Sequence, residues 1–292
     1  MKKQKAHLKD KTEGFFNFSD YKKTSFKIIY GIIIFLLIMF SLTAIIPILW
    51  LLITSFKTVN EINHLFPKSF DIMKLINLWN KLDFGRYYLN TIIVVLGAVV
   101  CSTIFNGLLA YATGILKPAG YKIVNKLILL SYMIPSALAI LPLIKQITSA
   151  GMINSYAPLW LTFGANAYYY LLFKDYFEKL PSSLIEAARI DGLNDFKIFF
   201  KVVLPISKSI IGVVAIFTMT AAYSDFLLPY LVLQDESMHT VMVAIYRLSS
   251  STTIDASEML MLLVLSIVPQ ILIFIIFQKQ IMGSAQNSGM KE

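Results

Sequence analysis

The sequence predicts an all-α membrane protein that crosses the bilayer about six times. Of the 292 residues, 57% are hydrophobic and only 15% are charged, and the mean hydropathy is +0.68. Soluble domains carry about 25% charged residues, so this composition excludes a soluble globular protein. Apolar stretches near the ~20 residues that cross the hydrocarbon core recur along the chain at 28–54, 89–114, 127–144, 156–173, 203–227 and 259–277.

The first apolar stretch follows a basic segment, as the apolar region of a secretory signal peptide does. It is much longer than the ~7 to 15 residues of such a region, and no small-residue cleavage site follows it. We therefore expect it to stay as a membrane anchor. The chain then has two parts, a basic cytoplasmic leader at 1–27 and a transmembrane domain at 28–292, which includes a cytoplasmic loop at 174–208.

The distribution of basic residues between the loops predicts the orientation. With the N-terminus in the cytoplasm, 19 of the 26 lysine and arginine residues fall on the cytoplasmic side, and cytoplasmic loops are enriched in these residues. Both termini are therefore expected in the cytoplasm. Because the basic residues are spread over several loops, the formal charge of +9 indicates attraction to anionic membrane lipid and not binding of nucleic acid.

The predicted spans contain almost no acidic or histidine side chain, and Asp225, near the outer end of the fifth stretch, is the exception. Ion-coupled carriers hold their ions with such groups, so an ion-driven carrier is not expected. No Gly-x-x-x-x-Gly-Lys-Ser/Thr phosphate loop occurs either, so uphill transport requires a separate subunit that hydrolyses the nucleotide. The histidines are far apart and Cys101 is the single cysteine, so we expect no metal site, no cofactor and no intramolecular disulfide.

The cytoplasmic loop contains signals for a short helix at about 181–191. Pro181 suits the first helical turn, Ser183 and Glu186 have the spacing of a capping box, and Gly192 suits the left-handed position that ends a helix. Two interpretations follow from these signals. The helix is either a capped interfacial element in which Glu186 serves as its own cap, or a docking element that presents its charges to a partner.

The same loop resembles the EAA signature of binding-protein-dependent ABC importer permeases. That signature reads Glu-Ala-Ala, three residues, Gly, nine residues and Ile-x-Leu-Pro, and the chain matches it over 186–205 with Val202 in place of Ile. Over nearly its whole length the chain also resembles the maltose-type, carbohydrate-importing branch of this family, although Tyr223 and Ser224 stand where the family has Trp and Asn. The matching stretches are 47–50, 55–57, 89–91, 110–112, 133–135, 181–192 and 222–229.

The resemblance implies the type I ABC importer permease fold and a place in a larger assembly in the cell membrane. The implied partners are a second homologous permease, two ATP-binding subunits, an extracytoplasmic solute-binding protein and a sugar, and the chain itself is then a transport subunit and not an enzyme. The loop helix is implied to couple to an ATP-binding subunit, with a salt bridge from Glu186 and a turn at Gly192. The residues implied in this coupling are Glu186, Ala187, Ala188, Arg189, Asp191, Gly192, Leu204 and Pro205.

Aromatic and polar residues near the ends of the fourth and fifth stretches are candidates for the sugar path, because sugars bind to aromatic faces and hydrogen-bonding groups. These candidates are Asn166, Tyr169, Tyr223, Ser224 and Asp225. Tyrosines at span ends also form interfacial belts, and consecutive tyrosines cannot all face one pore.

Two other functions stay open on the sequence. One is an ABC permease for a non-sugar solute, which the EAA loop alone permits. The other is a non-transport membrane scaffold or enzyme, which needs a catalytic constellation at the membrane surface, and none is evident in the sequence.

Overall fold

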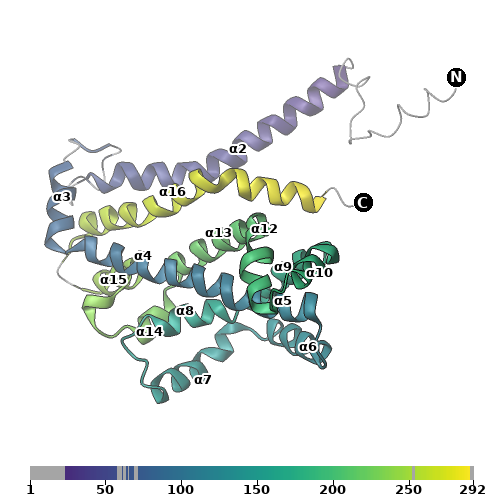
Figure 1. Cartoon of the computed structure of the whole chain (residues 1–292). Coiled ribbons are helices and arrows are strands. Elements are labelled where there is room, and N and C mark those ends of the chain that lie inside the picture. The colour runs from purple at the N-terminus through teal and green to yellow at the C-terminus, as the bar shows by residue number, and fades with distance from the viewer. Residues whose placement is uncertain are drawn as a thin grey trace. The chain divides into compact units, whose positions relative to one another are not determined.

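The computed structural model describes residues 24–57, 61, 64, 66–68, 72–251 and 254–289. The regular elements in these ranges are all helices (Figure 1), as the sequence predicts. The chain divides after Lys68 into two compact units. The first unit contains α2 (Thr24–Ser55), which begins within the last residues of the predicted leader, while residues 1–23 of that leader lie outside the described residues.

The second unit contains the other helices. In η3, η4 and η5 the helix is of the π type, and η6 is a single 3₁₀ turn. In chain order the elements are α3 (Ile72–Lys81), α4 (Phe84–Cys101), η3 (Ser102–Asn106), α5 (Gly107–Tyr111), η4 (Ala112–Leu116), α6 (Tyr121–Tyr132), α7 (Ser136–Ser149), α8 (Ala157–Gly164), α9 (Ala167–Phe177), α10 (Ser182–Ile190), α11 (Asp195–Ile198), η5 (Phe199–Val203), α12 (Leu204–Ile206), α13 (Lys208–Ser224), α14 (Leu227–Val232), η6 (Glu236–Met238), α15 (Val241–Ser249) and α16 (Ala256–Gly289).

Three continuous helical stretches are long and apolar enough to cross a membrane: Lys27–Ser55, Phe84–Leu116 and Ala256–Gln278. Two bent helix pairs pass the same test together. The α6–α7 pair bends by 107°, and the segment from α11 to α12 bends by 83° into α13. The described residues therefore contain up to five candidate spans, which confirms a polytopic all-α membrane protein.

Three of the predicted spans are interrupted, and the fifth, at 203–227, bends by 83° between α12 and α13. The third is broken between Tyr132 and Ser136, because Pro135 disfavours a helical conformation in the residue before it. The fourth, at 156–173, is divided between α8 and α9, which have 8 and 11 residues, so neither is long enough alone to cross the bilayer. Apolar residues continue up to and beyond this break, which is why hydropathy predicts a single helix there.

Helix α4 lies at the centre of the second unit and packs against α8 and α13 (Figure 1). At Gly97 the backbone of α4 lies so close to the Trp160 side chain of α8 that a Cβ atom would lie 2.2 Å from Nε1 of Trp160. The α4–η3 span is also joined to α13 by a buried pair of hydroxyls, with Oγ of Ser102 and Oγ1 of Thr218 2.9 Å apart. Small residues and hydroxyl pairs of this kind are the usual means by which membrane helices associate.

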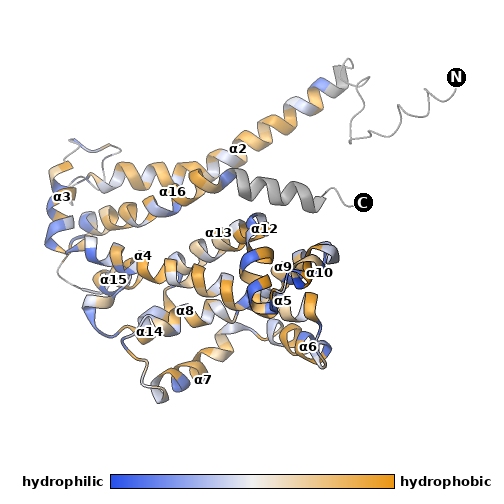
Figure 2. Ribbon diagram, in the orientation of Figure 1, coloured by the Kyte–Doolittle hydropathy of each residue, from blue (hydrophilic) through white to orange (hydrophobic). Residues whose placement is uncertain are grey.

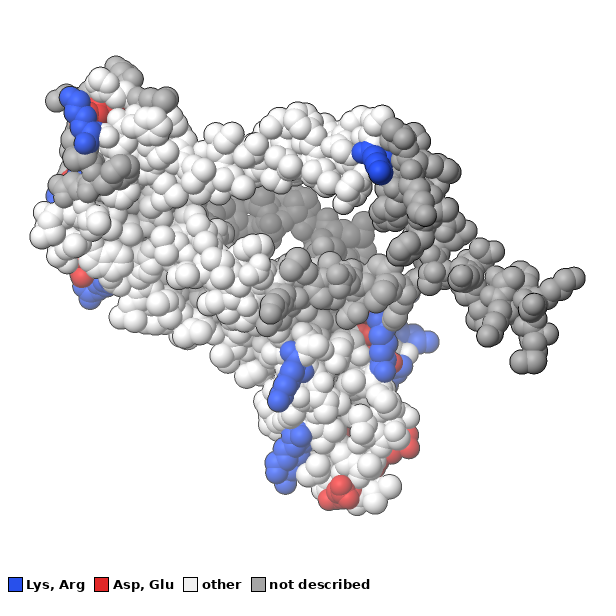
Figure 3. Space-filling view, turned by 90° about the horizontal axis from the view of Figure 1, so that it is seen from above, with Lys and Arg blue, Asp and Glu red and all other residues white. Residues whose placement is uncertain are grey.

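Apolar side chains cover the outward faces of the long helices. Leu96 in α4 and Phe274 in α16 are both 57% exposed, and these helices are mainly coloured as hydrophobic in Figure 2. Charged side chains gather near α3 at one end and near α10 at the other, with an uncharged band between them on the face shown in Figure 3. This distribution is expected where lipid contacts the middle of the protein and water contacts its ends.

Replacing Gly97 with alanine is expected to destabilise the protein, because the new methyl group overlaps the Trp160 indole and overpacking costs about 1–3 kcal/mol. Gly212→Ala in α13 is the matched control, since no atom lies within 4 Å of the Cβ position there. Thermal unfolding of both purified variants in detergent tests this expectation. Equal melting temperatures for the two variants would contradict the close α4–α8 contact.

Candidate functional site

The loop at 174–208 forms a short helix, α10, where the sequence predicts one. Pro181 precedes this helix in an extended conformation, with φ −60° and ψ 127°, and no side chain caps the first turn. The capping box predicted from Ser183 and Glu186 is therefore wrong. A capping box requires its serine at the N-cap, and because Pro181 takes that position, Ser183 lies inside the helix.

Helix α10 ends at Gly192 as predicted. Gly192 has φ +76°, a value that glycine adopts far more readily than other residues. Its N–H donates to the carbonyl of Arg189 at 3.0 Å, and the N–H of Leu193 donates to the carbonyl of Ala188 at 3.1 Å. These are the two bonds of a Schellman motif. No atom lies within 4 Å of the Cβ position of Gly192, so the demand for glycine is conformational.

One face of α10 is buried in the protein. Ile185 and Ala188 are each 5% exposed and belong to a cluster of core residues that includes Phe199 and Val203 of η5. Ala187 is exposed. The expectation that both alanines approach a partner is thus corrected for Ala188, because the helix turns that side chain into the protein's own core.

The opposite face of α10 combines apolar and charged side chains. Leu184 and Ile190 are 42% and 86% exposed, and Phe196 in the neighbouring α11 is 63% exposed. Glu186 is exposed as well, and within the described ranges its carboxylate forms neither a hydrogen bond nor an ion pair. Exposed apolar side chains around a charged group are typical of a surface that another protein covers.

The other coupling candidates have different surroundings. Arg189 is already paired, with its Nη2 3.1 Å from Oδ1 of Asp195, and this contact links α10 to α11. Since both side chains are about half exposed, the pair contributes little stability, about 0–1 kcal/mol. Asp191 and Pro205 are exposed, whereas Leu204 is partly buried and packs against the core cluster.

From α11 the helix continues through η5 and α12 before it bends by 83° into α13. Pro205 has no N–H, so the α-helical bond to the carbonyl of Lys201 cannot form, and the helix takes the wider π form over η5 just before it. Ile210 and Ile211 of α13 also pack against this core cluster, to which η5 contributes Phe199 and Val203. The buried face of α10 is therefore packed onto the segment that leads into a membrane-spanning helix.

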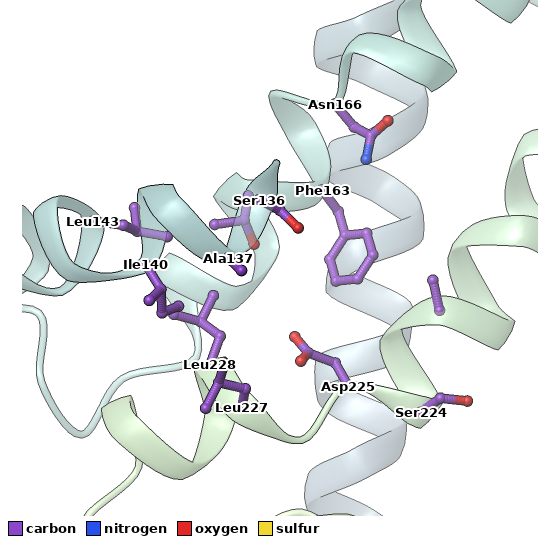
Figure 4. Close-up of a pocket in the computed structure, with 12 residues that line it drawn as sticks. Ser136, Ala137, Ile140, Leu143, Phe163, Asn166, Ser224, Asp225, Leu227 and Leu228 are labelled. Carbon is purple, nitrogen blue, oxygen red and sulfur yellow. The ribbon is translucent and has the colours of Figure 1, made fainter. Parts of the chain in front are cut away.

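A cavity of about 540 Å³ lies between α7, α8, α13 and α14 (Figure 4). Its wall is mainly apolar, with a small number of polar groups, which is the usual composition of a small-molecule site. The polar residues that line it are Ser136, Thr162, Asn166, Ser224 and Asp225.

Three of the five path candidates line this cavity, namely Asn166, Ser224 and Asp225. The other two do not. Tyr169 is 4% exposed and packs in the core cluster. Tyr223 is 5% exposed, and its hydroxyl donates to the carbonyl of Ser266 in α16 at 2.6 Å. The structure thus places both tyrosines in helix packing, away from the cavity.

Three other residues that line the cavity were not predicted from the sequence. Thr162 contributes a hydroxyl group. Ser136 contributes a second hydroxyl and Phe163 an aromatic ring (Figure 4). Ser136 is the first residue of α7, directly after the break at Pro135. A polar residue beside a proline within an apolar stretch is a signal that could have identified it.

Asp225 directly follows α13 in an extended conformation, with ψ 127°. Its carboxyl group lies toward the backbone N–H groups of residues 226–228, where α14 begins. Ser224 accepts a hydrogen bond from Nε2 of Gln270 in α16. In Figure 4 the side chains of Asp225 and Asn166 extend from opposite walls toward the same space.

A helical membrane protein with a cavity between broken helices and an exposed, capped loop helix has the features of a membrane-embedded transport subunit. The chain belongs to the family of binding-protein-dependent transport system inner membrane components, whose sequence model matches residues 17–282. It is a multi-pass permease subunit of an ABC importer.

Named relatives agree with this assignment. The chain is 33% identical over 259 residues to the diacetylchitobiose uptake system permease protein NgcG of Streptomyces coelicolor, covering 86% of each protein. It is 28% identical over 261 residues to the arabinooligosaccharides transport system permease protein AraQ of Bacillus subtilis, covering 87% of this chain and 92% of that protein.

The fold is also similar to that of a solved structure. A chain in the crystal structure of a bacterial ABC transporter involved in the import of the acidic polysaccharide alginate superposes with a TM-score of 0.77. The sequence identity is 23%, and the match covers 91% of this chain and 99% of the other. The similarity supports the type I importer permease fold.

Tyr223→Phe is expected to lower the stability of the purified permease slightly, because an interhelical hydrogen bond in a membrane contributes about 0.6 kcal/mol on average. Solute uptake should not change, since the ring stays in place and the lost hydroxyl faces α16. Asp225→Asn, which replaces a carboxyl group in the cavity wall with an amide, should alter uptake instead. Thermal unfolding and transport assays on both variants separate the two roles, and a stable Tyr223→Phe variant without uptake would place the hydroxyl in the path.

Proposed function

We propose that this permease forms, with a second homologous permease, the path by which a sugar or oligosaccharide enters the cell, driven by ATP hydrolysis in two separate subunits. The observation that carries the proposal is the exposed face of α10, where Glu186 has no partner in the described part of the chain. The names of NgcG and AraQ refer to diacetylchitobiose and arabinooligosaccharides, which supports a carbohydrate as the solute.

The coupling step of this proposal uses the two faces of α10 differently. On the exposed face, Glu186 forms a salt bridge with a basic residue of an ATP-binding subunit, and Ala187 lets the two surfaces approach closely. Leu184, Ile190 and Phe196 fill the apolar part of the same contact. Gly192 and Asp191 complete the turn that presents the helix.

The buried face transmits the movement. The buried residues of α10 and η5 belong to one core cluster, against which Ile210 and Ile211 at the start of α13 pack. Because tightly packed side chains move together, a displacement of α10 shifts α13, whose other end leads to Asp225 in the cavity wall. This contact chain converts closure of the ATP-binding subunits into a change at the solute path, a hinge-type transition.

The cavity supplies groups suited to a sugar. The Asn166 amide, the Asp225 carboxylate and the Ser136 and Thr162 hydroxyls can exchange hydrogen bonds with sugar hydroxyls, and the Phe163 ring offers an apolar face. A solute-binding protein delivers the sugar from outside. Uptake assays with a panel of labelled saccharides and a labelled polyamine distinguish this proposal from import of a non-sugar solute. Uptake of a labelled saccharide should be inhibited by other unlabelled saccharides and should not be inhibited by the polyamine.

The orientation and the division of the chain are part of the same proposal. Both termini, the leader at 1–27 and the loop at 174–208 lie in the cytoplasm, because most basic residues are then on the cytoplasmic side. The domain at 28–292 is the transmembrane permease domain. The α10 surface then faces the compartment where ATP is available.

Glu186→Lys is expected to abolish uptake, because it places a positive charge opposite the basic group of the ATP-binding subunit. Truncating one member of a buried interfacial pair already costs about 2–5 kcal/mol of binding free energy. Uptake is measured in cells, and retention of the ATP-binding subunits is measured by co-purification with the tagged permease.

Glu178→Lys is the matched control for this reversal. Glu178 is an exposed carboxylate near α10 that already has a partner in the chain, Lys174 at 2.7 Å, so its reversal should leave uptake and co-purification near the wild-type level. Normal uptake by Glu186→Lys would remove the coupling role from α10.

The orientation is tested with single cysteines in a Cys101→Ala background. Ser183→Cys and Ser250→Cys both replace exposed serines, one in α10 and one directly after α15. In intact cells an impermeant thiol reagent should label position 250 and leave position 183 unlabelled until the membrane is opened. Labelling of position 183 from outside would reverse the proposed topology.

A further inference from the structure

The break between α8 and α9 exposes backbone polar groups in the middle of a predicted span. Ala165 leaves the helical conformation, with φ −110° and ψ 46°, and Asn166 follows with φ −102° and ψ 115°. Within the hydrocarbon region no water is available to bond the freed N–H and C=O groups, so each needs a partner inside the protein.

Asn106, the last residue of η3, supplies those partners. Its Nδ2 donates to the carbonyl of Phe163 at 2.9 Å and to the carbonyl of Ser102 at 2.8 Å. Its Oδ1 accepts from the backbone N–H of Asn166 at 3.0 Å. One buried amide, 2% exposed, thus bonds the chain on both sides of the break.

The approach of η3 to the break is close. A Cβ atom at Gly164 would lie 2.8 Å from Cδ2 of Phe105 and 3.4 Å from the carbonyl oxygen of Cys101. Because Gly164 has no side chain, η3 can approach the break closely enough for Asn106 to bond the backbone on both sides of it.

Asn166 has two roles on the other side of this contact. Its own Oδ1 accepts from the N–H of Tyr169 at 3.1 Å, which caps α9, and its side chain lines the cavity. Asn106 does not line the cavity. It fixes the backbone from which the Asn166 side chain extends.

We propose that Asn106 is a positioning residue for the solute site: by bonding Phe163 and Asn166 across the break, it sets the direction of the Asn166 amide and the Phe163 ring in the cavity. This inference rests on the proposed function for its transport readout. It goes beyond that function because it assigns solute affinity to a residue that the solute does not touch.

Removal of the Asn106 amide leaves the Phe163 carbonyl and the Asn166 N–H without partners in an apolar environment. These groups then seek other bonds, and the break changes shape. Asn106→Ala should therefore raise the KM for uptake about tenfold, equivalent to the loss of roughly one well-placed interaction, with a smaller change in maximal rate.

A double-mutant cycle on KM separates positioning from general stabilisation. Asn166→Ala should raise KM by a similar factor, and Asn106→Ala combined with Asn166→Ala should raise it by less than the product of the two factors, because Asn106 acts in part through Asn166 and in part through Phe163. Multiplicative effects in the double variant would overturn the proposal.

Two companion variants make the transport result specific. Ser102→Ala removes the bond to Thr218 from the same π-helical segment without touching the break, so its KM should match that of the wild type.

Asn106→Asp keeps the shape, and in this apolar position its carboxyl is expected to be protonated. It then retains one acceptor and one donor, so its KM should fall between those of the wild type and Asn106→Ala. An unaltered KM in Asn106→Ala would overturn the assignment.

A second readout needs no solute and so separates failure of this inference from failure of the proposed function. In the Cys101→Ala background, Asn166→Cys places a thiol in the cavity of the purified permease, and its rate of reaction with a water-soluble methanethiosulfonate is measured. Adding Asn106→Ala should change this rate severalfold, because the backbone at position 166 is released. An unchanged rate would overturn the inference even if the wild type transports sugar, whereas absence of sugar uptake by the wild type would count against the proposed function alone.

Discussion

Backbone hydrogen bonding within the membrane is the constraint on which the rest of this structure depends. A helix can cross the hydrocarbon core because it satisfies its own N–H and C=O groups, and any interruption must be repaired by the protein itself. This permease interrupts its helices at the ends of α6, α8 and α13. Each interruption is followed by a polar residue that lines the cavity: Ser136, Asn166 and Asp225. The breaks remove backbone hydrogen bonds from the helices, and they also place polar side chains in the mainly apolar wall of the cavity.

The loop at 174–208 follows the opposite principle. Helix α10 is complete, ends in a fully bonded Schellman turn at Gly192 and keeps one face in the core. A short helix of nine residues is marginal by itself in water, so packing of Ile185 and Ala188 holds it in place. Its exposed face can then carry apolar side chains and Glu186, which has no partner among the residues that the structure describes, without loss of local order. Such a surface is rigid before a partner arrives, which lowers the entropy lost on docking.

Most of the helices and the loop helix were predictable because apolar run length, proline and glycine act locally. Gly192 and α10 follow from rules that involve only neighbouring residues. The failures at Asn166 and Tyr223 depend on contacts between distant segments. The break at Asn166 is stabilised by Asn106, sixty residues earlier in the chain, and the burial of Tyr223 depends on α16. The capping box failed for a local reason, since Pro181 competes for the N-cap and hydrophobic periodicity does not show which residue takes it.

The positions of Asn166 and Asp225 relative to α10 follow from how their helices are packed. Helix α13 contributes Ile210 and Ile211 near its start to the same cluster that receives α10, and α9 contributes Phe173 and Phe177. Asn166 precedes α9 and Asp225 follows α13, so both polar groups are attached to helices that meet in this cluster. In the proposed mechanism, a displacement of α10 is therefore transmitted through this single cluster to the cavity walls that carry Asn166 and Asp225.

The α7 wall is attached differently, through the 107° bend after α6 and a separate apolar cluster with α4, α8 and α14. The cavity is therefore bounded by walls from two packed clusters, and relative movement between those clusters changes its shape without breaking either one.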